Sequence, residues 1–193
     1  CTVVGVAKGA GMIMPQMATM LAFLITDARV EPSALRALLT ELCDETFNAM
    51  SVDGDTSTND SVYLLASGRS RAGTKQLRPL LRAVMRDLAL AIVRDGEGAT
   101  KLVTITVEQA RTVDEARKVA RRIATSPLVK TAFFGADPNW GRIACAAGNA
   151  GVRFNPSRLE IDIGEVAVMR NGLGIPDVAA AARQAMRRPQ FSV

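Results

Sequence analysis

The sequence predicts a layered α/β fold in which helices cover the sheets. Segments whose apolar residues have helical spacing alternate along the chain with short, strand-like apolar runs. A length of 193 residues and a hydrophobic content of 48% are enough to bury a core. No internal repeat, low-complexity tract or linker divides the sequence, so we expect one domain, or a large part of one, over residues 1–193.

Two helices and a strand are predicted in the first half of the chain. Residues 33–50, preceded by Pro32, carry leucines at helical spacing, and residues 76–93 repeat this pattern up to the glycines of "RDGEG". Between them, "SVYLLAS" at 61–67 has the length and composition of a strand. Each helix presents a single apolar stripe, which is typical of a helix packed on a sheet.

The second half continues the alternation. "KLVTITVE" at 101–108 alternates apolar and polar residues like a half-buried strand, and Thr112 with Glu115 forms a capping box for a helix that runs to about Ala124. The remaining pattern predicts a strand at 128–134, a turn at 135–140, a small-residue helix at 140–148, strands at 159–164 and 166–170, and a last helix at 177–187.

Composition and charge exclude several classes of protein. Twenty-four Lys and Arg against nineteen Asp and Glu give a net charge of +5, but only 4% of residues are aromatic and the arginines of "TVDEARKVARRI" are interleaved with acids. We therefore expect no nucleic acid partner. No apolar run is long enough to span a bilayer, and "CTVVGVAKG" lacks the regions of a signal peptide, so we expect a soluble, cytoplasmic protein without a membrane partner.

The three cysteines and the absence of histidine limit the possible chemistry. Cys1, Cys43 and Cys145 form no CxxC pair, so a disulfide scaffold and a zinc site are not expected, and Cys43 and Cys145 are expected to be buried. Without histidine, a Ser/His/Asp or Cys/His mechanism cannot be assembled. A general base must be a carboxylate, a lysine or a free α-amine, whose ordinary pKa of ~7.7–8.0 suits it to accept a proton near neutral pH.

Two residues could combine a nucleophile with an α-amine. Cys1 begins the sequence, and Thr19 would be released by cleavage of the bond between Ala18 and Thr19. In the second case the Thr19 hydroxyl attacks the Ala18 carbonyl, and water hydrolyses the resulting ester. The alternative is that "MATMLAF" is an ordinary buried strand or helix start.

Three further segments have a functional and a structural interpretation. "KGAG" is a poor phosphate loop because Lys8 precedes the glycines. "DGDTSTND" at 53–60 resembles a calcium loop, but Thr58 stands where glycine is required and Leu64 where glutamate is required, so a polar turn is favoured. Glu97, between two glycines, is either a carboxylate held in the open or part of a surface turn.

Taken in order, "AKGAGMIMPQMATMLAF", "DGDTSTNDSV", "EGATK" and "FGADPNWGRI" resemble the bifunctional ornithine acetyltransferase family, also called glutamate N-acetyltransferase. The resemblance implies that the precursor cuts itself between Ala18 and Thr19. Residues 1–18 would then end an α chain and residues 19–193 would belong to a β chain. It also implies that Thr19 is the nucleophile, that Lys8 and Glu97 bind substrate, and that Cys1 has no catalytic role.

The same resemblance implies a fold of two β layers between helices and a role in arginine biosynthesis. Acetyl transfer would be ping-pong: Thr19 takes the acetyl group of N-acetylornithine, ornithine leaves, and glutamate accepts the acetyl group to give N-acetylglutamate. No metal or organic cofactor is implied, although acetyl-CoA is a possible donor. The expected partners are these substrates and the α and β chains, assembled as a heterotetramer.

Family members extend beyond both ends of this sequence. The upstream part supplies the oxyanion hole, and the downstream part supplies an asparagine and a terminal Ser or Thr that bind substrate. We therefore expect the chain to be the central part of a longer protein. Two other functions stay open: an N-terminal-nucleophile amidohydrolase or aminopeptidase, in which water replaces glutamate, and a calcium-binding module built on residues 53–60.

Overall fold

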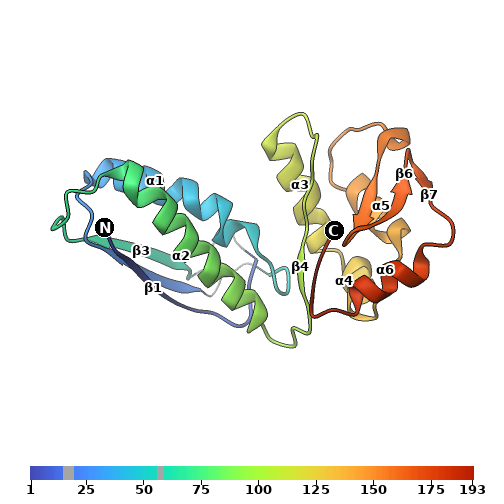
Figure 1. Ribbon diagram of the computed structural model, residues 1–193, viewed down its shortest axis with the longest axis horizontal. Helices are drawn as coiled ribbons and strands as arrows, with labels where there is room; N and C mark the ends of the chain where they lie inside the picture. Colours follow the sequence, from blue (N-terminus) through green and yellow to red (C-terminus); the bar gives the residue numbers. More distant parts are fainter. Residues whose placement is uncertain (15–19, 56–58) are drawn as a thin grey trace. The chain divides into compact units, whose positions relative to one another are not determined.

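The computed structural model describes residues 1–14, 20–55 and 59–193. It divides into two compact units, Cys1–Ala99 and Thr100–Val193 (Figure 1). Both units contain helices and strands, which confirms the mixed α/β class. Two such units can belong to one domain, so the single-domain prediction stays a prediction.

The first unit is a three-stranded sheet with two helices on one face (Figure 1). Strand β2 lies in the centre, antiparallel to β1 and parallel to β3. The predicted helices and strand are confirmed to within a few residues. In chain order the elements are β1 (Val3–Lys8), β2 (Leu21–Thr26), α1 (Pro32–Glu45), the short 3-10 helix η1 (Phe47–Ala49), β3 (Ser61–Ala66) and α2 (Thr74–Arg94).

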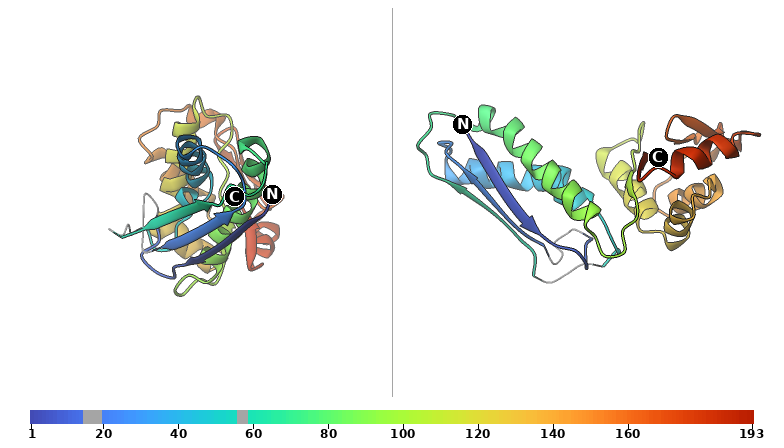
Figure 2. Two further views of the ribbon diagram at one scale, coloured as in Figure 1. Left: turned by 90° about the vertical axis from the view of Figure 1, so that its left-hand side faces the viewer. Right: turned by 60° about the horizontal axis from the view of Figure 1, so that its bottom comes forward.

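The period-2 pattern of β2 separates a buried face from an exposed one. Ala22 and Leu24 are fully buried beneath the helices. Helix α2 packs along β1 (Figure 2), and Gly5 permits this close approach, because a side chain there would lie 2.8 Å from atoms of Val84 and Leu88. The helices contribute the rest of this core, with Leu38 and Leu42 from α1 and Leu77, Leu81, Met85, Ala89 and Ile92 from α2.

The opposite face of this sheet is apolar and exposed, and we call it the open face. Phe23 and Tyr63 stack on it with ring centroids 5.1 Å apart. These two rings and their apolar neighbours on β1, β2 and β3 are each 41–63% exposed. An exposed apolar patch of this kind is unusual on a free surface and is typical of an interface. The open face consists of Val4, Val6, Phe23, Ile25, Tyr63 and Leu65.

The second unit contains four helices and two small sheets. Strand β4 pairs in parallel with β8, and β5, β6 and β7 form an antiparallel sheet. The elements are β4 (Leu102–Thr104), α3 (Val113–Ala124), α4 (Pro127–Phe134), α5 (Trp140–Gly148), η2 (Pro156–Arg158), β5 (Ile161–Ile163), β6 (Val166–Arg170), β7 (Leu173–Gly174), α6 (Ala179–Met186) and β8 (Gln190–Ser192).

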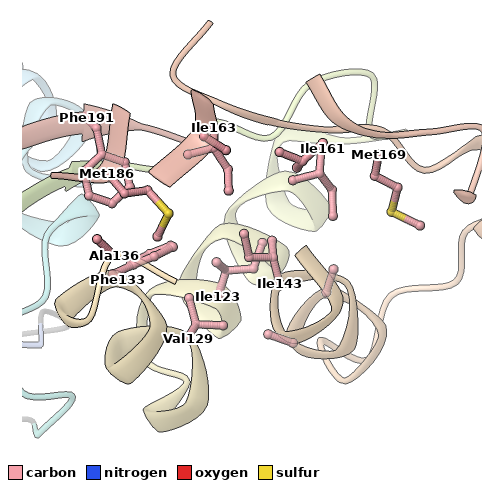
Figure 3. Close-up of a cluster of buried hydrophobic side chains, with 14 of the residues drawn as sticks. Ile123, Val129, Phe133, Ala136, Ile143, Ile161, Ile163, Met169, Met186 and Phe191 are labelled. Atoms are coloured by element: carbon pink, nitrogen blue, oxygen red, sulfur yellow. The ribbon is translucent and has the colours of Figure 1, made fainter. Parts of the chain in front are cut away.

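The core of the second unit gathers side chains from its helices and from both sheets (Figure 3). Phe133 of α4 meets Phe191 of β8 edge to face, with ring centroids 5.4 Å apart. Ile123, Ile143 and Ile163 come from α3, α5 and β5 and are at least 95% buried. Segments far apart in the sequence are therefore fixed in one cluster.

Residues 128–134 are helical, and the predicted strand is wrong. The segment belongs to α4, whose first turn is capped by the Ser126 hydroxyl accepting the Val129 N–H at 3.4 Å. Pro127 occupies the first helical position, where its missing N–H costs nothing. The buried residues Val129 and Phe133 are four apart, as a helix requires.

One other segment of the second unit differs in detail from the sequence analysis, and the cap of α3 agrees with it. The strand predicted at 101–108 is only three residues long, Leu102–Thr104. The Thr112 hydroxyl caps α3 by accepting the Glu115 N–H at 3.2 Å, as predicted. The Glu115 carboxylate accepts hydrogen bonds from the guanidinium of Arg111.

The cysteines are free thiols, and one of them is not where the sequence analysis expected it. Cys145 is exposed, because the buried face of α5 carries Ile143 and Ala146 instead. Cys43 is half-buried, and burial raises the pKa of its thiol to about 11. In the part of the chain that the structure describes, no helix has both the length and the apolarity that crossing a bilayer demands.

Candidate active site

A pocket of about 900 Å³ lies where β1 and α2 both end in the first unit. The charged residues in its lining are Lys8, the last residue of β1, and Asp95 and Glu97, which follow α2. Lys8 and Glu97, two of the residues predicted to bind substrate, lie near opposite ends of this unit's sequence, and the fold brings them into one pocket. The lining comprises residues 7–12 together with Leu88, Ala91, Ile92, Asp95 and Glu97.

Glu97 is held by its backbone and lies against a glycine. Its N–H donates to the Ala10 carbonyl at 2.8 Å, which fixes the turn after α2 to the segment after β1. A side chain at Gly11 would lie 2.9 Å from Glu97 Cδ and 3.0 Å from each carboxylate oxygen. The Glu97 carboxylate therefore occupies space that a side chain at residue 11 would fill. Gly98, with φ of 68°, allows the chain to turn directly after Glu97.

The predicted cleavage residues Ala18 and Thr19 lie outside the described residues. The nearest described residue is Met20, which is 5% exposed. The β1–β2 register pairs Lys8 with Leu21, so the described chain after Thr19 begins beside the lysine that lines the pocket. Both backbone polar groups of Met20 are hydrogen-bonded. Its N–H donates to Asp60 Oδ1 at 2.5 Å, and its carbonyl accepts the Ser61 N–H at 3.1 Å.

Asp53 holds the backbone of Met12 and Ile13, which lie in the sequence before the predicted cleavage residues. Its carboxylate accepts the N–H of Met12 at 2.6 Å and of Ile13 at 2.9 Å, and also the Asp55 N–H at 3.0 Å. The last of these is an Asx turn, as the polar-turn interpretation of 53–60 expects. Met12 adopts a left-handed backbone with φ of 57°, which turns both amides toward the carboxylate.

These contacts disfavour the calcium-loop alternative. The Asp53 oxygens are directed at three backbone N–H groups, whereas a calcium loop needs them directed at the ion. Across the described residues, no three acidic or thiol side chains come together in an arrangement that could hold a metal ion. Residues 56–58 of the same motif lie outside the description.

The electrostatics of Asp60 set it apart from an ordinary surface carboxylate. Burial raises the pKa of Asp60, and this effect outweighs the Met20 N–H and the Lys8 ammonium, which both lower it. Sequence reasoning missed Asp53, Asp60 and Gly11 as parts of this site. The available signal for Asp60 was a carboxylate placed directly before a strand that begins at Ser61.

The fold and the pocket define an α/β protein with a concave site, lined in part by charged residues, where β1 and α2 end. The chain belongs to the ArgJ family, whose model matches residues 1–193. This confirms the family predicted from the four motifs.

Similar proteins from several organisms carry the name "Arginine biosynthesis bifunctional protein ArgJ". That of Thermosynechococcus vestitus is 53% identical over 92% of this chain and 44% of its own length. That of Syntrophotalea carbinolica is 49% identical over 100% of this chain and 51% of its own length. A crystal structure of the protein of the same name from Bacillus halodurans is 38% identical, with a TM-score of 0.83, and covers 88% of this chain and 85% of the solved chain. The chain spans about half the length of the curated relatives it matches.

Proposed function

We propose that the full-length protein transfers an acetyl group from N-acetylornithine to glutamate in arginine biosynthesis, through an acetyl ester on Thr19. The observation that carries the proposal is the pocket in which Lys8 and Glu97 meet beside the strand that follows Thr19. The substrates contain both carboxylates and amines, and a site lined by a lysine and by acidic residues is suited to hold such molecules.

The mechanism begins with self-cleavage between Ala18 and Thr19. The Thr19 hydroxyl attacks the Ala18 carbonyl and forms an ester, and water then releases residues 1–18 as the end of an α chain and residues 19–193 as part of a β chain. The new α-amine of Thr19 acts as base, because its ordinary pKa of ~7.7–8.0 suits it to accept a proton near neutral pH. It takes the proton of the hydroxyl when Thr19 attacks the acetyl carbonyl and returns it to the leaving amine of ornithine.

The lengths of the similar proteins support this processing. The solved Bacillus halodurans chain is covered to 85% by the present chain, whereas the curated relatives are covered to only 44–51%. The solved chain is therefore about half as long as those relatives, which is consistent with a precursor that becomes two chains.

Lys8 and Glu97 have complementary roles in binding. The Lys8 ammonium suits a substrate carboxylate, and the Glu97 carboxylate suits an amino group of ornithine. Both bind rather than react, and the ester on Thr19 holds the acetyl group without a cofactor. Acetyl-CoA is a possible alternative donor.

The open face supports a finer description of the fold. Six exposed apolar residues on one sheet face fit an α-β-β-α sandwich, in which a second sheet covers Phe23, Tyr63 and their neighbours. We propose that residues 1–193 form part of one such acetyltransferase domain, in a soluble, cytoplasmic heterotetramer of α and β chains.

The proposal is tested with Thr19→Ala in the full-length protein. We expect a precursor that stays in one piece and makes no N-acetylglutamate, whereas Cys1→Ala cleaves and transfers normally. Intact-mass measurement reports the cleavage, and N-acetylglutamate formation reports the transfer. A Thr19→Ala protein that is cleaved and active would refute the mechanism, and acetate release from N-acetylornithine without glutamate would favour an amidohydrolase.

A further inference from the structure

The part of the pocket lining formed by residues 10–12 is held in place by Asp53. The Asp53 carboxylate accepts the Met12 N–H at 2.6 Å and the Ile13 N–H at 2.9 Å, each with a different oxygen. Met12 has a left-handed backbone with φ of 57°, which a residue with a side chain adopts only at a cost in free energy. Hydrogen bonds to an ionised carboxylate are stronger than those to a neutral acceptor, so the two bonds favour this conformation. Asp53 therefore sets the path of the backbone at Met12.

The same residues of the lining contact Glu97 at two points. The Glu97 N–H donates to the Ala10 carbonyl at 2.8 Å. The Glu97 carboxylate lies directly against the backbone of Gly11, where an added methyl would be 2.9 Å from Cδ. A change in the backbone at Met12 therefore moves the residue next to it, against which the carboxylate rests.

Val52 connects the segment around Asp53 with the residue before Glu97. The Val52 N–H donates to the Ile13 carbonyl at 2.7 Å. The two methyl groups of Val52 fill the space beside Gly96, where an added side-chain carbon would lie 2.8 and 2.9 Å from them. The neighbours Val52 and Asp53 thus hold the lining segment by hydrogen bonds and pack on the turn that carries Glu97.

We infer that Asp53 is a positioning residue for the Glu97 carboxylate, and that it thereby increases the affinity of the pocket for the amino group of the substrate. The inference rests on the proposed function, because it takes Glu97 as the group that binds an amine of ornithine. Asp53 is not among the described residues that line the pocket, so it acts through residues 10–12 and not by touching the substrate.

The freedom of the Glu97 side chain explains why such positioning matters. Glu97 is exposed, and within the described part of the chain its side chain forms no hydrogen bond or ion pair. A glutamate in this situation has several rotamers to lose when it binds a ligand. Contact with a fixed Gly11 limits these rotamers before the substrate arrives, and preorganisation of this kind strengthens binding. The expected effect is therefore on KM and not on the chemical step.

The test compares four variants of the full-length enzyme: Asp53→Asn, Glu97→Gln, the double variant of these two, and Asp55→Asn as a matched control. Asparagine at position 53 replaces one acceptor oxygen by a donor, so one of the bonds to Met12 and Ile13 is lost. Asp55 is the other exposed aspartate of this turn, and its carboxylate forms no hydrogen bond among the described residues. The measured quantities are kcat, the KM for N-acetylornithine and Tm.

We expect Asp53→Asn to raise KM by about threefold to tenfold and to keep kcat within about twofold of the wild type. Asp55→Asn should match the wild type in both constants. If Asp53 acts through Glu97, the two single effects are not independent. The KM of the double variant should then stay within about twofold of that of Glu97→Gln alone.

Three results would overturn the inference. One is an unchanged KM in Asp53→Asn with a loss of kcat that follows Tm, because an unfolded fraction lowers the amount of active enzyme without changing its KM. Another is a KM in the double variant that equals the product of the two single effects, which would mean that Asp53 acts independently of Glu97. The third is an equal rise of KM in Asp55→Asn.

The variant Thr19→Ala separates failure of this inference from failure of the proposed function. If Thr19→Ala is inert and Asp53→Asn keeps the wild-type KM, only the positioning role fails. If Thr19→Ala is itself cleaved and active, the proposed transfer mechanism fails, whatever the KM of Asp53→Asn.

Discussion

Replacement of Gly11 by alanine tests whether the position of the Glu97 carboxylate governs substrate binding. The added methyl would lie 2.9 Å from Glu97 Cδ and 3.0 Å from both oxygens, closer than the 3.4 Å at which ordinary contacts begin. Because Glu97 is exposed and its side chain is flexible, the carboxylate can move away, so the fold should lose little stability. The alanine also reduces the freedom of the unfolded chain, which offsets part of the cost.

The displaced carboxylate should bind the substrate amine less well. A hydrogen bond to a charged group contributes about 1.5–3 kcal/mol, so losing the weaker end of this range lowers kcat/KM for N-acetylornithine by about tenfold. The assay is the steady-state rate of N-acetylglutamate formation by the full-length enzyme, together with its Tm.

Gly148→Ala is the matched control, because no atom lies within 4 Å of the methyl that it adds at the end of α5. The reasoning would be refuted if Gly11→Ala kept the wild-type kcat/KM while Glu97→Gln lost it. In that case the carboxylate would bind substrate from a position other than the one beside Gly11.

Two further predictions follow from the pKa shifts. The pKa of Asp60 is raised in the folded state, so the folded protein gains stability from its protonated form below the unfolded value of 3.8 and loses it as the pH rises through the folded pKa. The Tm of Asp60→Asn minus the Tm of the wild type should therefore increase as the pH is raised from about 3.5 to about 7, because asparagine does not ionise. A Tm difference that stays constant over this range would contradict the burial of Asp60. Cys43, whose pKa is raised to about 11, should resist iodoacetamide at pH 8 while the exposed Cys1 and Cys145 react, as read by peptide mass spectrometry; faster labelling of Cys43 would contradict its burial.

The long helices could be predicted because their apolar residues repeat over many turns. Helix α2 has buried residues at 77, 81, 85, 89 and 92, a pattern that no strand can produce. Residues 128–134 are too short for such a repeat, and an apolar run of this length fits a strand as well as a helix. The deciding signal was local: Ser126 followed by Pro127 marks the start of a helix.

The candidate site was predictable only in part. Lys8 and Glu97 were identified from motifs, and the structure brings both into one pocket. The role of Asp53 could not be read from local pattern, because its carboxylate bonds backbone amides about forty residues earlier in the chain. Side chains that hold a distant backbone leave no periodic signal, since any polar turn has the same composition.

The pairing of β1 with β2 has a consequence for the proposed self-cleavage. The Ala18–Thr19 bond lies between these strands in the sequence, so the proposed cleavage would leave Val3–Lys8 and Leu21–Thr26 on different polypeptides that are joined by six residue pairs and by the helix packed on β1. The two products should copurify without a covalent link. Once denatured, they would have to find each other again, so recovery of the native enzyme should become a second-order process that slows on dilution.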